Sequence, residues 1–209
     1  MMGERYLFLT SDGLSNDMKQ KFWDIIGKQP QNTKVLYIPT AGIKTDGARE
    51  GIAVCLYELS LMGIPDDNIF VYNLELILSK DYKKTYSSYF KNPSIITRLL
   101  TTEELREFDA VFVGGGDCLI LCSEMARTGF ENELRKAVDN GLVYVGISAG
   151  SMYAAGNSVE CLHIIDNPII PHWNGIQSME LPCDNGEIKL ADGQTIYIEN
   201  DRIRLLSIK

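Results

Sequence analysis

The sequence is poor in histidine and has no long apolar run. It contains 2 histidines and 5 cysteines in 209 residues. No stretch approaches the roughly 18–20 apolar residues of a transmembrane helix, and the first residues show no signal-peptide pattern. The cysteines form no CxxC pair and no Cys/His ligand pattern, so we expect no metal site and no cofactor. Cys118 and Cys122 share one face of a predicted helix, but buried thiols in a reducing cytoplasm are the simpler interpretation.

An excess of basic residues is also lacking. Lys and Arg number 20 against 28 Asp and Glu, which gives a formal net charge of -8. This balance argues against binding to nucleic acid or to an anionic membrane. The chain has no internal repeat and no low-complexity linker, so we predict a single domain over residues 1–209. A homodimer is compatible with these features, which do not specify an oligomeric state.

Strand-like and helix-like segments alternate along the chain. Short apolar runs predict strands, and helical spacing of apolar residues predicts helices between them. The predicted strands cover residues 6–10, 35–38, 69–72, 110–113, 143–145 and 168–170, and the predicted helices cover 15–27, 46–62 and, with a break near Gly129, 118–140. Strands without alternation indicate a parallel sheet with helices on both faces, which is a three-layer α/β sandwich.

Two segments depart from this pattern. Strand-like runs at 187–190, 195–199 and 202–208 are separated by turn residues, which predicts an antiparallel C-terminal extension of the sheet. Residues 75–106 form a less regular insertion with several tyrosines among lysines. We expect these aromatic residues to dock the insertion onto the body of the protein, although a lid is the alternative.

Two glycine-rich turns follow predicted strands: GGGD at 114–117 and GISAGS at 146–151. Ligands of parallel sheets bind beyond the carboxyl ends of the strands. Ser148 occupies the position of a nucleophile at a strand-to-helix turn, where the N–H of Ala149 and that of Gly115 or Gly116 could form an oxyanion hole. The turns match neither G-x-G-x-x-G nor the P-loop, so a non-catalytic phosphate cradle lacks its usual support.

A serine nucleophile needs a base, and the sequence offers His163 and His172. His172 follows the predicted strand 168–170 and is flanked by Pro171 and Trp173, which would restrain it. His163 lies in a run typical of packing or a turn. We therefore favour His172 as the base.

At these residues the sequence resembles the peptidase E group of serine peptidases, the alpha-aspartyl dipeptidases. The motifs are IPTA (38–41), VGGGD (113–117), GISAGS (146–151) and IIPHW (169–173), and the resemblance runs from about residue 5 to 173. It implies a fold like that of class I glutamine amidotransferases. It also implies hydrolysis of small peptides with an N-terminal aspartate, with Ser148 as nucleophile and His172 as base.

The family takes its third catalytic residue, an acid, from a longer segment between serine and histidine. Here that segment is short, and its carboxylates are Glu160 and Asp166. We name Asp166 as the substitute acid, although a turn role before Asn167 and Pro168 is the simpler interpretation. Three explanations stay open: residues near 157–159 and after 174 are missing from the sequence, the enzyme uses a dyad or a relocated acid, or the chain is a degenerate homologue that acts as a binding protein.

Substrate specificity leaves further alternatives. An N-terminal aspartate calls for a positive group near the site, and Arg127 and Arg49 are the candidates, although a solvated helix face is the simpler interpretation for Arg127. A serine hydrolase of another substrate class is a second possibility. An α/β-hydrolase esterase would place further strand–helix units between its serine and histidine, and too few residues separate Ser148 from His172 for that.

Overall fold

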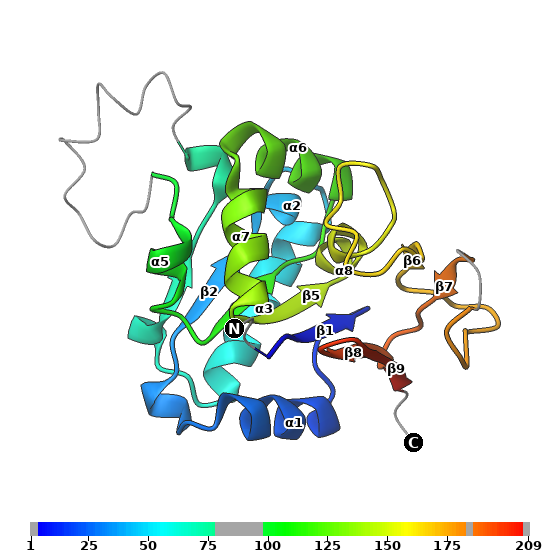
Figure 1. Cartoon of the computed structure of the whole chain (residues 1–209), viewed down its shortest axis with the longest axis horizontal. Helices are drawn as coiled ribbons and strands as arrows, with labels where there is room; N and C mark the ends of the chain where they lie inside the picture. The colour runs from blue at the N-terminus through cyan, green and yellow to red at the C-terminus, as the bar shows by residue number, and fades with distance from the viewer. Residues whose placement is uncertain (1–3, 78–97, 183–185, 207–209) are drawn as a thin grey trace.

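A seven-stranded sheet forms the centre of the molecule (Figure 1). The structure is a computed structural model, and it describes residues 4–77, 98–182 and 186–206. In the order β3-β2-β4-β5-β1-β8-β9, the first five strands pair in parallel and the last two are antiparallel. The strands are β1 (Tyr6–Thr10), β2 (Val35–Ile38), β3 (Ile69–Val71), β4 (Ala110–Val113), β5 (Val143–Ile147), β8 (Thr195–Glu199) and β9 (Arg202–Leu206). The predicted mostly parallel sheet and its antiparallel extension are thus confirmed.

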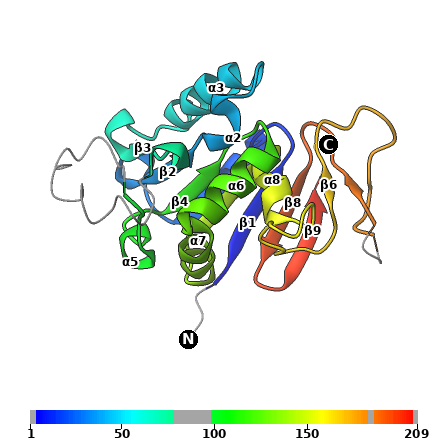
Figure 2. The ribbon, with the colours of Figure 1, turned by 90° about the horizontal axis from the view of Figure 1, so that it is seen from above.

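Helices cover both faces of the sheet (Figure 2). Side chains alternate along β1, because Leu7 and Leu9 pack with α6, α7 and α8 while Phe8 packs with α1 and α3. The helices are α1 (Asn16–Ile26), α2 (Thr40–Ile43), α3 (Ala48–Leu61), α5 (Thr102–Leu105), α6 (Cys118–Thr128), α7 (Phe130–Asp139) and α8 (Ala149–Ala154), with 3-10 turns at Pro30–Asn32, Asp66–Asn68 and Leu74–Leu76. The predicted three-layer sandwich is therefore confirmed.

Local sequence signals account for the ends of α6. The side chain of Asp117 caps its first turn by accepting hydrogen bonds from the N–H groups of Leu119 and Ile120 at 2.7 and 3.3 Å. Gly129 ends the helix in the left-handed conformation at φ 74°, which glycine adopts without steric cost. The predicted break near Gly129 is thus where α7 begins.

Two short helices have no counterpart in the sequence prediction. Both α2 and α5 contain 4 residues, too few to show a helical period. A capping box fixes α5, in which Thr101 and Glu104 each bond to the other's backbone N–H.

The tyrosines of the predicted insertion at 75–106 lie outside the described residues. Within the described ranges, no helix has both the length and the hydropathy that a membrane span requires.

A separate two-stranded sheet lies on the β9 side of the molecule (Figures 1 and 2). It consists of β6 (Ile169–Ile170) and β7 (Ile188–Lys189), which run parallel. We predicted the run at 187–190 as part of the antiparallel extension, and this was wrong. The N–H groups of Ile188 and Leu190 instead donate to the carbonyl oxygens of Pro168 and Ile170, at 2.8 and 2.9 Å. These bonds hold the segment that leads to His172.

Candidate active site

Ser148 lies at a sharp turn between β5, which ends at Ile147, and α8, which begins at Ala149. Its backbone adopts φ 50° and ψ -107°, a region that side-chain-bearing residues rarely occupy. Gly150 makes the turn feasible, because a Cβ there would lie 2.1 Å from the carbonyl oxygen of Val113. The first turn of α8 therefore packs directly on β4. This is the geometry of a nucleophile elbow.

The two serines of the GISAGS turn have different environments. Ser151 is fully buried and donates its hydroxyl to the carbonyl oxygens of Thr10 and Gly146, at 2.7 and 2.9 Å. It therefore ties α8 to β1 and β5. The hydroxyl of Ser148 instead lines a cavity at the carboxyl edge of the sheet. Of the two, Ser148 is the one placed for chemistry.

His172 lies beside Ser148, with its Nε2 atom 3.1 Å from the Ser148 Oγ. That separation suits a general base and its nucleophile. The N–H of His172 donates to the Ser11 Oγ at 2.7 Å, which holds the histidine backbone to the segment after β1. His163 lies elsewhere, because its Nε2 is 2.8 Å from the carbonyl oxygen of Ser158.

Asp192 contacts the other ring nitrogen of the histidine. Its Oδ1 lies 2.9 Å from the His172 Nδ1 and accepts the hydroxyl of Ser11 at 2.7 Å. The hydrogen bond from Ser11 lowers the pKa of Asp192, and the hydrogen bond and charge of His172 lower it further. The sheet creates this contact, because the antiparallel pairing of Thr10 with Thr195 brings the turn before β8 to the end of β1.

The structure does not bring Asp166 to the histidine. Asp166 is exposed and its carbonyl lies against Gly156, so the carboxylate at the His172 Nδ1 is that of Asp192. The choice of Asp166 is thus contradicted by the geometry. Sequence reasoning missed Asp192 because it follows the histidine in the chain and, with Gly193, belongs to a D-G pair that we interpreted only as a turn. The signal that could have identified Asp192 was its position just before the predicted strand at 195–199.

The GGGD turn lies against Ser148. A Cβ at Gly115 would lie 3.2 Å from the Cβ of Ser148, so only glycine allows this approach without a shift. Gly116 has φ 132°, and a Cβ there would lie 2.1 Å from the carbonyl oxygen of Ala41. Gly115 therefore lies directly against Ser148, Gly116 lines the same cavity as Ser148, and Ala149 follows Ser148 at the start of α8.

A cavity of about 570 Å³ opens beside the serine and histidine. This volume is typical of small-molecule sites. Apolar side chains from α3 and from the segment after β1 form much of its wall. The lining residues include Leu14, Val54, Met62 and Phe112. Among the described lining residues, Lys19 is the one cation, and it is paired with Glu58.

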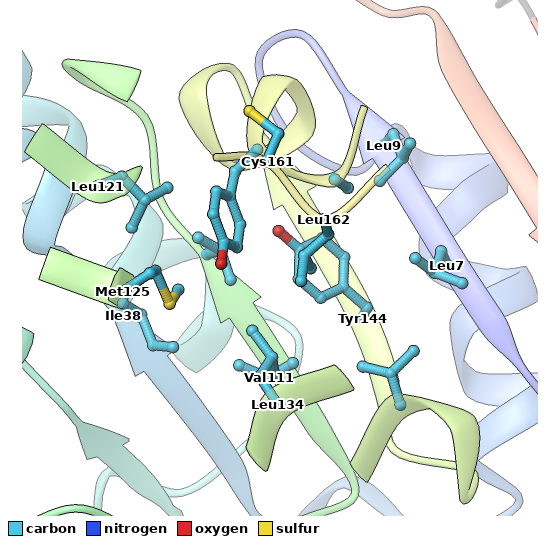
Figure 3. Packing of buried hydrophobic residues seen from close by; sticks show 14 of the residues in the cluster. Leu7, Leu9, Ile38, Val111, Leu121, Met125, Leu134, Tyr144, Cys161 and Leu162 are labelled. Carbon is cyan, nitrogen blue, oxygen red and sulfur yellow. The ribbon is translucent and has the colours of Figure 1, made fainter. Parts of the chain in front are cut away.

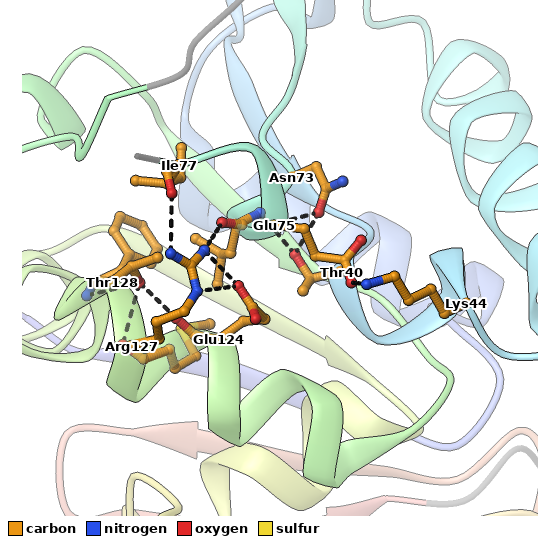
Figure 4. A network of polar contacts seen from close by, with 11 residues as sticks. Thr40, Lys44, Asn73, Glu75, Ile77, Glu124, Arg127 and Thr128 are labelled. Carbon is orange, nitrogen blue, oxygen red and sulfur yellow. Dashed lines mark hydrogen bonds and ion pairs between the residues drawn. The ribbon is translucent and has the colours of Figure 1, made fainter. Parts of the chain in front are cut away.

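The two arginines considered for substrate binding have other partners. Arg127 pairs with Glu124 and donates to the carbonyl oxygens of Leu74 and Ile77, at 2.8 and 3.1 Å (Figure 4). Arg127 therefore ties the 3-10 turn at Leu74–Leu76 to α6 and is not simply a charged residue on a solvated helix face. Arg49 donates to the carbonyl oxygen of Ile43 at 3.0 Å.

The fold is a three-layer α/β sandwich, and at its edge lies a serine–histidine–aspartate arrangement of a kind that recurs in hydrolases of unrelated folds. The model of peptidase family S51 matches residues 92–206, which is more than half of the chain. The chain therefore belongs to peptidase family S51, and the resemblance to peptidase E is confirmed.

Individual relatives agree with this assignment. A Peptidase E from Streptomyces coelicolor is 42% identical over 82 residues, which cover 33% of this chain and 34% of that protein. The match thus spans about a third of the relative's length. The solved structure of a protein from Listeria monocytogenes EGD-e has a TM-score of 0.65 at 19% identity and covers 99% of this chain and 100% of that chain. A peptidase from an acI-B1 Actinobacterium has a TM-score of 0.62 at 19% identity, with 100% and 88% covered. At that identity, these two structures establish the fold.

Proposed function

We propose that this chain hydrolyses small peptides by a serine mechanism. The observation that carries the proposal is the chain of contacts from Ser148 through His172 to Asp192, with separations of 3.1 and 2.9 Å. In the proposed mechanism, Ser148 is the nucleophile, His172 is the general base and then the general acid, and Asp192 orients the histidine.

The reaction begins when the Ser148 Oγ attacks the peptide carbonyl carbon. The hydroxyl proton passes to the Nε2 of His172, while the Nδ1–H of the ring donates to the Asp192 carboxylate. This hydrogen bond fixes the tautomer that leaves Nε2 free to accept a proton. When the tetrahedral intermediate collapses, the same Nε2 protonates the leaving amine and an acyl-enzyme remains. Water, activated by His172, then releases the acid product.

The negative charge that develops on the carbonyl oxygen needs donors close to Ser148. In this proposal they are the N–H of Ala149, at the start of α8, and that of Gly115 or Gly116. The contact between Gly115 and Ser148 supports this pairing of the two turns. Losing one such donor typically costs about 3–4 kcal/mol of transition-state stabilisation.

For the substrate, we propose dipeptides with an N-terminal aspartate, as the family resemblance implies. Lys19 is the described cation of the cavity, and an acidic substrate would compete with Glu58 for it. The apolar wall of the same cavity favours a second candidate, a serine hydrolase whose substrate carries an apolar side chain. The two candidates share the same catalytic residues and differ in substrate alone. We place the reaction in the cytoplasm, in keeping with the free thiols of the chain.

The deciding experiment compares Asp-Xaa and Leu-Xaa dipeptides as substrates of the wild type and of Ser148→Ala. We expect the wild type to hydrolyse at least one of them, and the variant to lose that activity with unchanged circular dichroism. Ser60→Ala is the matched control, because Ser60 is an exposed residue of α3 whose hydroxyl bonds to Asp66. It should retain full activity.

Covalent labelling tests the nucleophile independently of the substrate. A fluorophosphonate should add once to the wild type, and peptide mapping should find it on Ser148. If Ser148→Ala retains activity or the label, the nucleophile assignment is wrong. A folded wild type that neither turns over peptides nor reacts with the reagent would support the binding-protein alternative.

A further inference from the structure

Three cysteines from two separate segments of the chain meet behind the GGGD turn. The Sγ atoms of Cys118 and Cys122 are 3.9 Å apart, and those of Cys122 and Cys161 are 3.7 Å apart. All three sulfur atoms lie within 4.8 Å of one another. Cys118 and Cys122 occupy the first two turns of α6, and Cys161 comes from the segment after α8. We call these residues the three-thiol cluster.

The spacing of the sulfur atoms matches that of ligands around one metal ion. With a Zn–S bond of about 2.3 Å, two sulfurs lie about 3.8 Å apart in a tetrahedral site and about 4.0 Å apart in a planar three-ligand site. The measured 3.9 and 3.7 Å fall at these values. A disulfide would need two sulfurs at about 2.05 Å. The cluster is therefore already close to the geometry of a three-thiolate site.

The three cysteines of the cluster differ in how far each residue is exposed. Cys122 is fully buried and Cys161 is 3% exposed, whereas Cys118 is only partly buried. As a group, the three thiols are buried.

The remaining wall of the cluster is packed and apolar. Figure 3 shows Cys161 at the edge of a group of side chains that includes Leu121, Met125 and Tyr144, and all of these belong to one buried core. A buried, largely apolar setting with three sulfur atoms suits soft cations.

We propose that the three-thiol cluster binds one soft, thiophilic cation, Zn²⁺ or Cu⁺. Each sulfur binds the ion as a thiolate, so every thiol that is still protonated releases its proton to solvent and no electron is transferred. Cu⁺ would be three-coordinate, and Zn²⁺ would need a fourth ligand to complete a tetrahedron. Cys118 directly follows the GGGD turn, so the ion would join that turn to the segment that follows α8.

The test titrates the full-length protein, reduced with a phosphine and free of metal, against each cation in turn. Zn²⁺ is measured by competition with a chromophoric chelator and Cu⁺ by competition with bicinchoninate under nitrogen. Co²⁺ reports the ligands, because thiolates bound to it give a near-ultraviolet charge-transfer band. We expect one equivalent bound, the thiolate band with Co²⁺, and a higher thermal midpoint with the tighter of the two ions.

Matched cysteine variants locate the site. Cys118→Ser changes the partly buried member and should keep the fold by circular dichroism, yet weaken metal binding by more than about 100-fold, since even the loss of a group that only supports a ligand costs about 10–100-fold. Cys161→Ser is the second variant and should behave alike. Cys55→Ser is the control, because Cys55 is a buried free thiol of α3 outside the cluster. It should bind metal as the wild type does.

Three results would overturn the proposal. One is that the chelators retain both Zn²⁺ and Cu⁺ in the presence of reduced wild-type protein. Another is that Cys118→Ser and Cys161→Ser bind metal as tightly as Cys55→Ser. The third is that the fully reduced protein binds no metal and that mild oxidation removes two of the cluster's thiols, which would identify a disulfide-forming pair instead.

Discussion

Ser11 connects two residues of the proposed catalytic site, His172 and Asp192. It is fully buried, accepts the N–H of His172 and donates to the carboxylate of Asp192. One hydroxyl thus positions both the base and the acid, whose side chains are 54% and 60% exposed. A buried group has fewer alternative positions than an exposed one. We conclude that the buried hydroxyl of Ser11 holds the two exposed side chains in position.

Replacing Asp192 with asparagine should lower kcat by about 10²–10⁴-fold, because the amide no longer fixes the histidine tautomer. Circular dichroism should be unchanged, since Asp192 is exposed. Steady-state kinetics on the best peptide substrate provide the measurement. Asp166→Asn is the matched control and should retain activity. Equal losses in the two variants would argue against Asp192 as the orienting acid.

The strained backbone of Ser148 leads to a stability prediction. A non-glycine residue in such a region costs about 1–3 kcal/mol, and glycine avoids most of that cost. Ser148→Gly should therefore unfold at a higher urea concentration than Ser148→Ala, although both lack the nucleophile. Urea titrations followed by circular dichroism give the difference. If alanine were the more stable of the two, the turn would not be strained.

At the scale of the elements, β5 and α8 are joined by a buried tyrosine. The hydroxyl of Tyr144 donates to the carbonyl oxygen of Gly150 at 2.7 Å, next to the nucleophile. The hydroxyl of Tyr153 is also buried, but it has no hydrogen-bond partner among the described residues. The two tyrosines therefore form a natural pair for measuring what a buried hydroxyl contributes.

Tyr144→Phe should destabilise the protein by about 0.5–1.5 kcal/mol, because it removes a buried hydrogen bond to the carbonyl of Gly150. Tyr153→Phe should be neutral or stabilising, since it removes a hydroxyl that gains nothing from burial. The free energy of unfolding of each variant, from urea titration, provides the comparison. A loss in Tyr153→Phe equal to that in Tyr144→Phe would show that Tyr153 has a partner in solution.

Most elements could be predicted from the sequence, because buried parallel strands and amphipathic helices leave strong local patterns. The bounds 6–10, 35–38, 110–113 and 195–199 agree with the structure to the residue. The sequence could not give the pairing of 187–190 with β6, because a short apolar run fits either sheet. The candidate active site could likewise be predicted only in part. Ser148 and His172 stand in recognisable motifs, whereas the role of Asp192 depends on the pairing of β8 with β1.

At the scale of the whole molecule, the sheet collects the catalytic residues from distant parts of the chain. Ser11 follows β1, Ser148 follows β5, His172 follows β6, and Asp192 precedes β8. Because β8 is antiparallel to β1, the start of β8 lies at the same edge as the ends of the parallel strands. The site can therefore form only when the C-terminal extension has joined the sheet.

This coupling predicts that the site and the sheet unfold together. Trp173 adjoins His172, with its indole N–H donating to Ile176, and Trp23 lies in α1. In a Trp23→Phe variant, Trp173 fluorescence should report on the site alone. Its urea transition should coincide with that of the far-ultraviolet circular dichroism. An earlier fluorescence transition would mean that the C-terminal strands detach before the rest.

The position of Asp192 beyond the histidine also bears on how such proteins diversify. The segment between nucleophile and base carries neither the acid nor a sheet strand before β6, and its middle residue Val159 is 94% exposed. Surface loops of this kind tolerate insertions at little thermodynamic cost. None of the residues between Ser148 and His172, all of which the structure describes, lines the cavity, so this surface segment can be lengthened or trimmed while Ser148, His172 and Asp192 keep their relative positions.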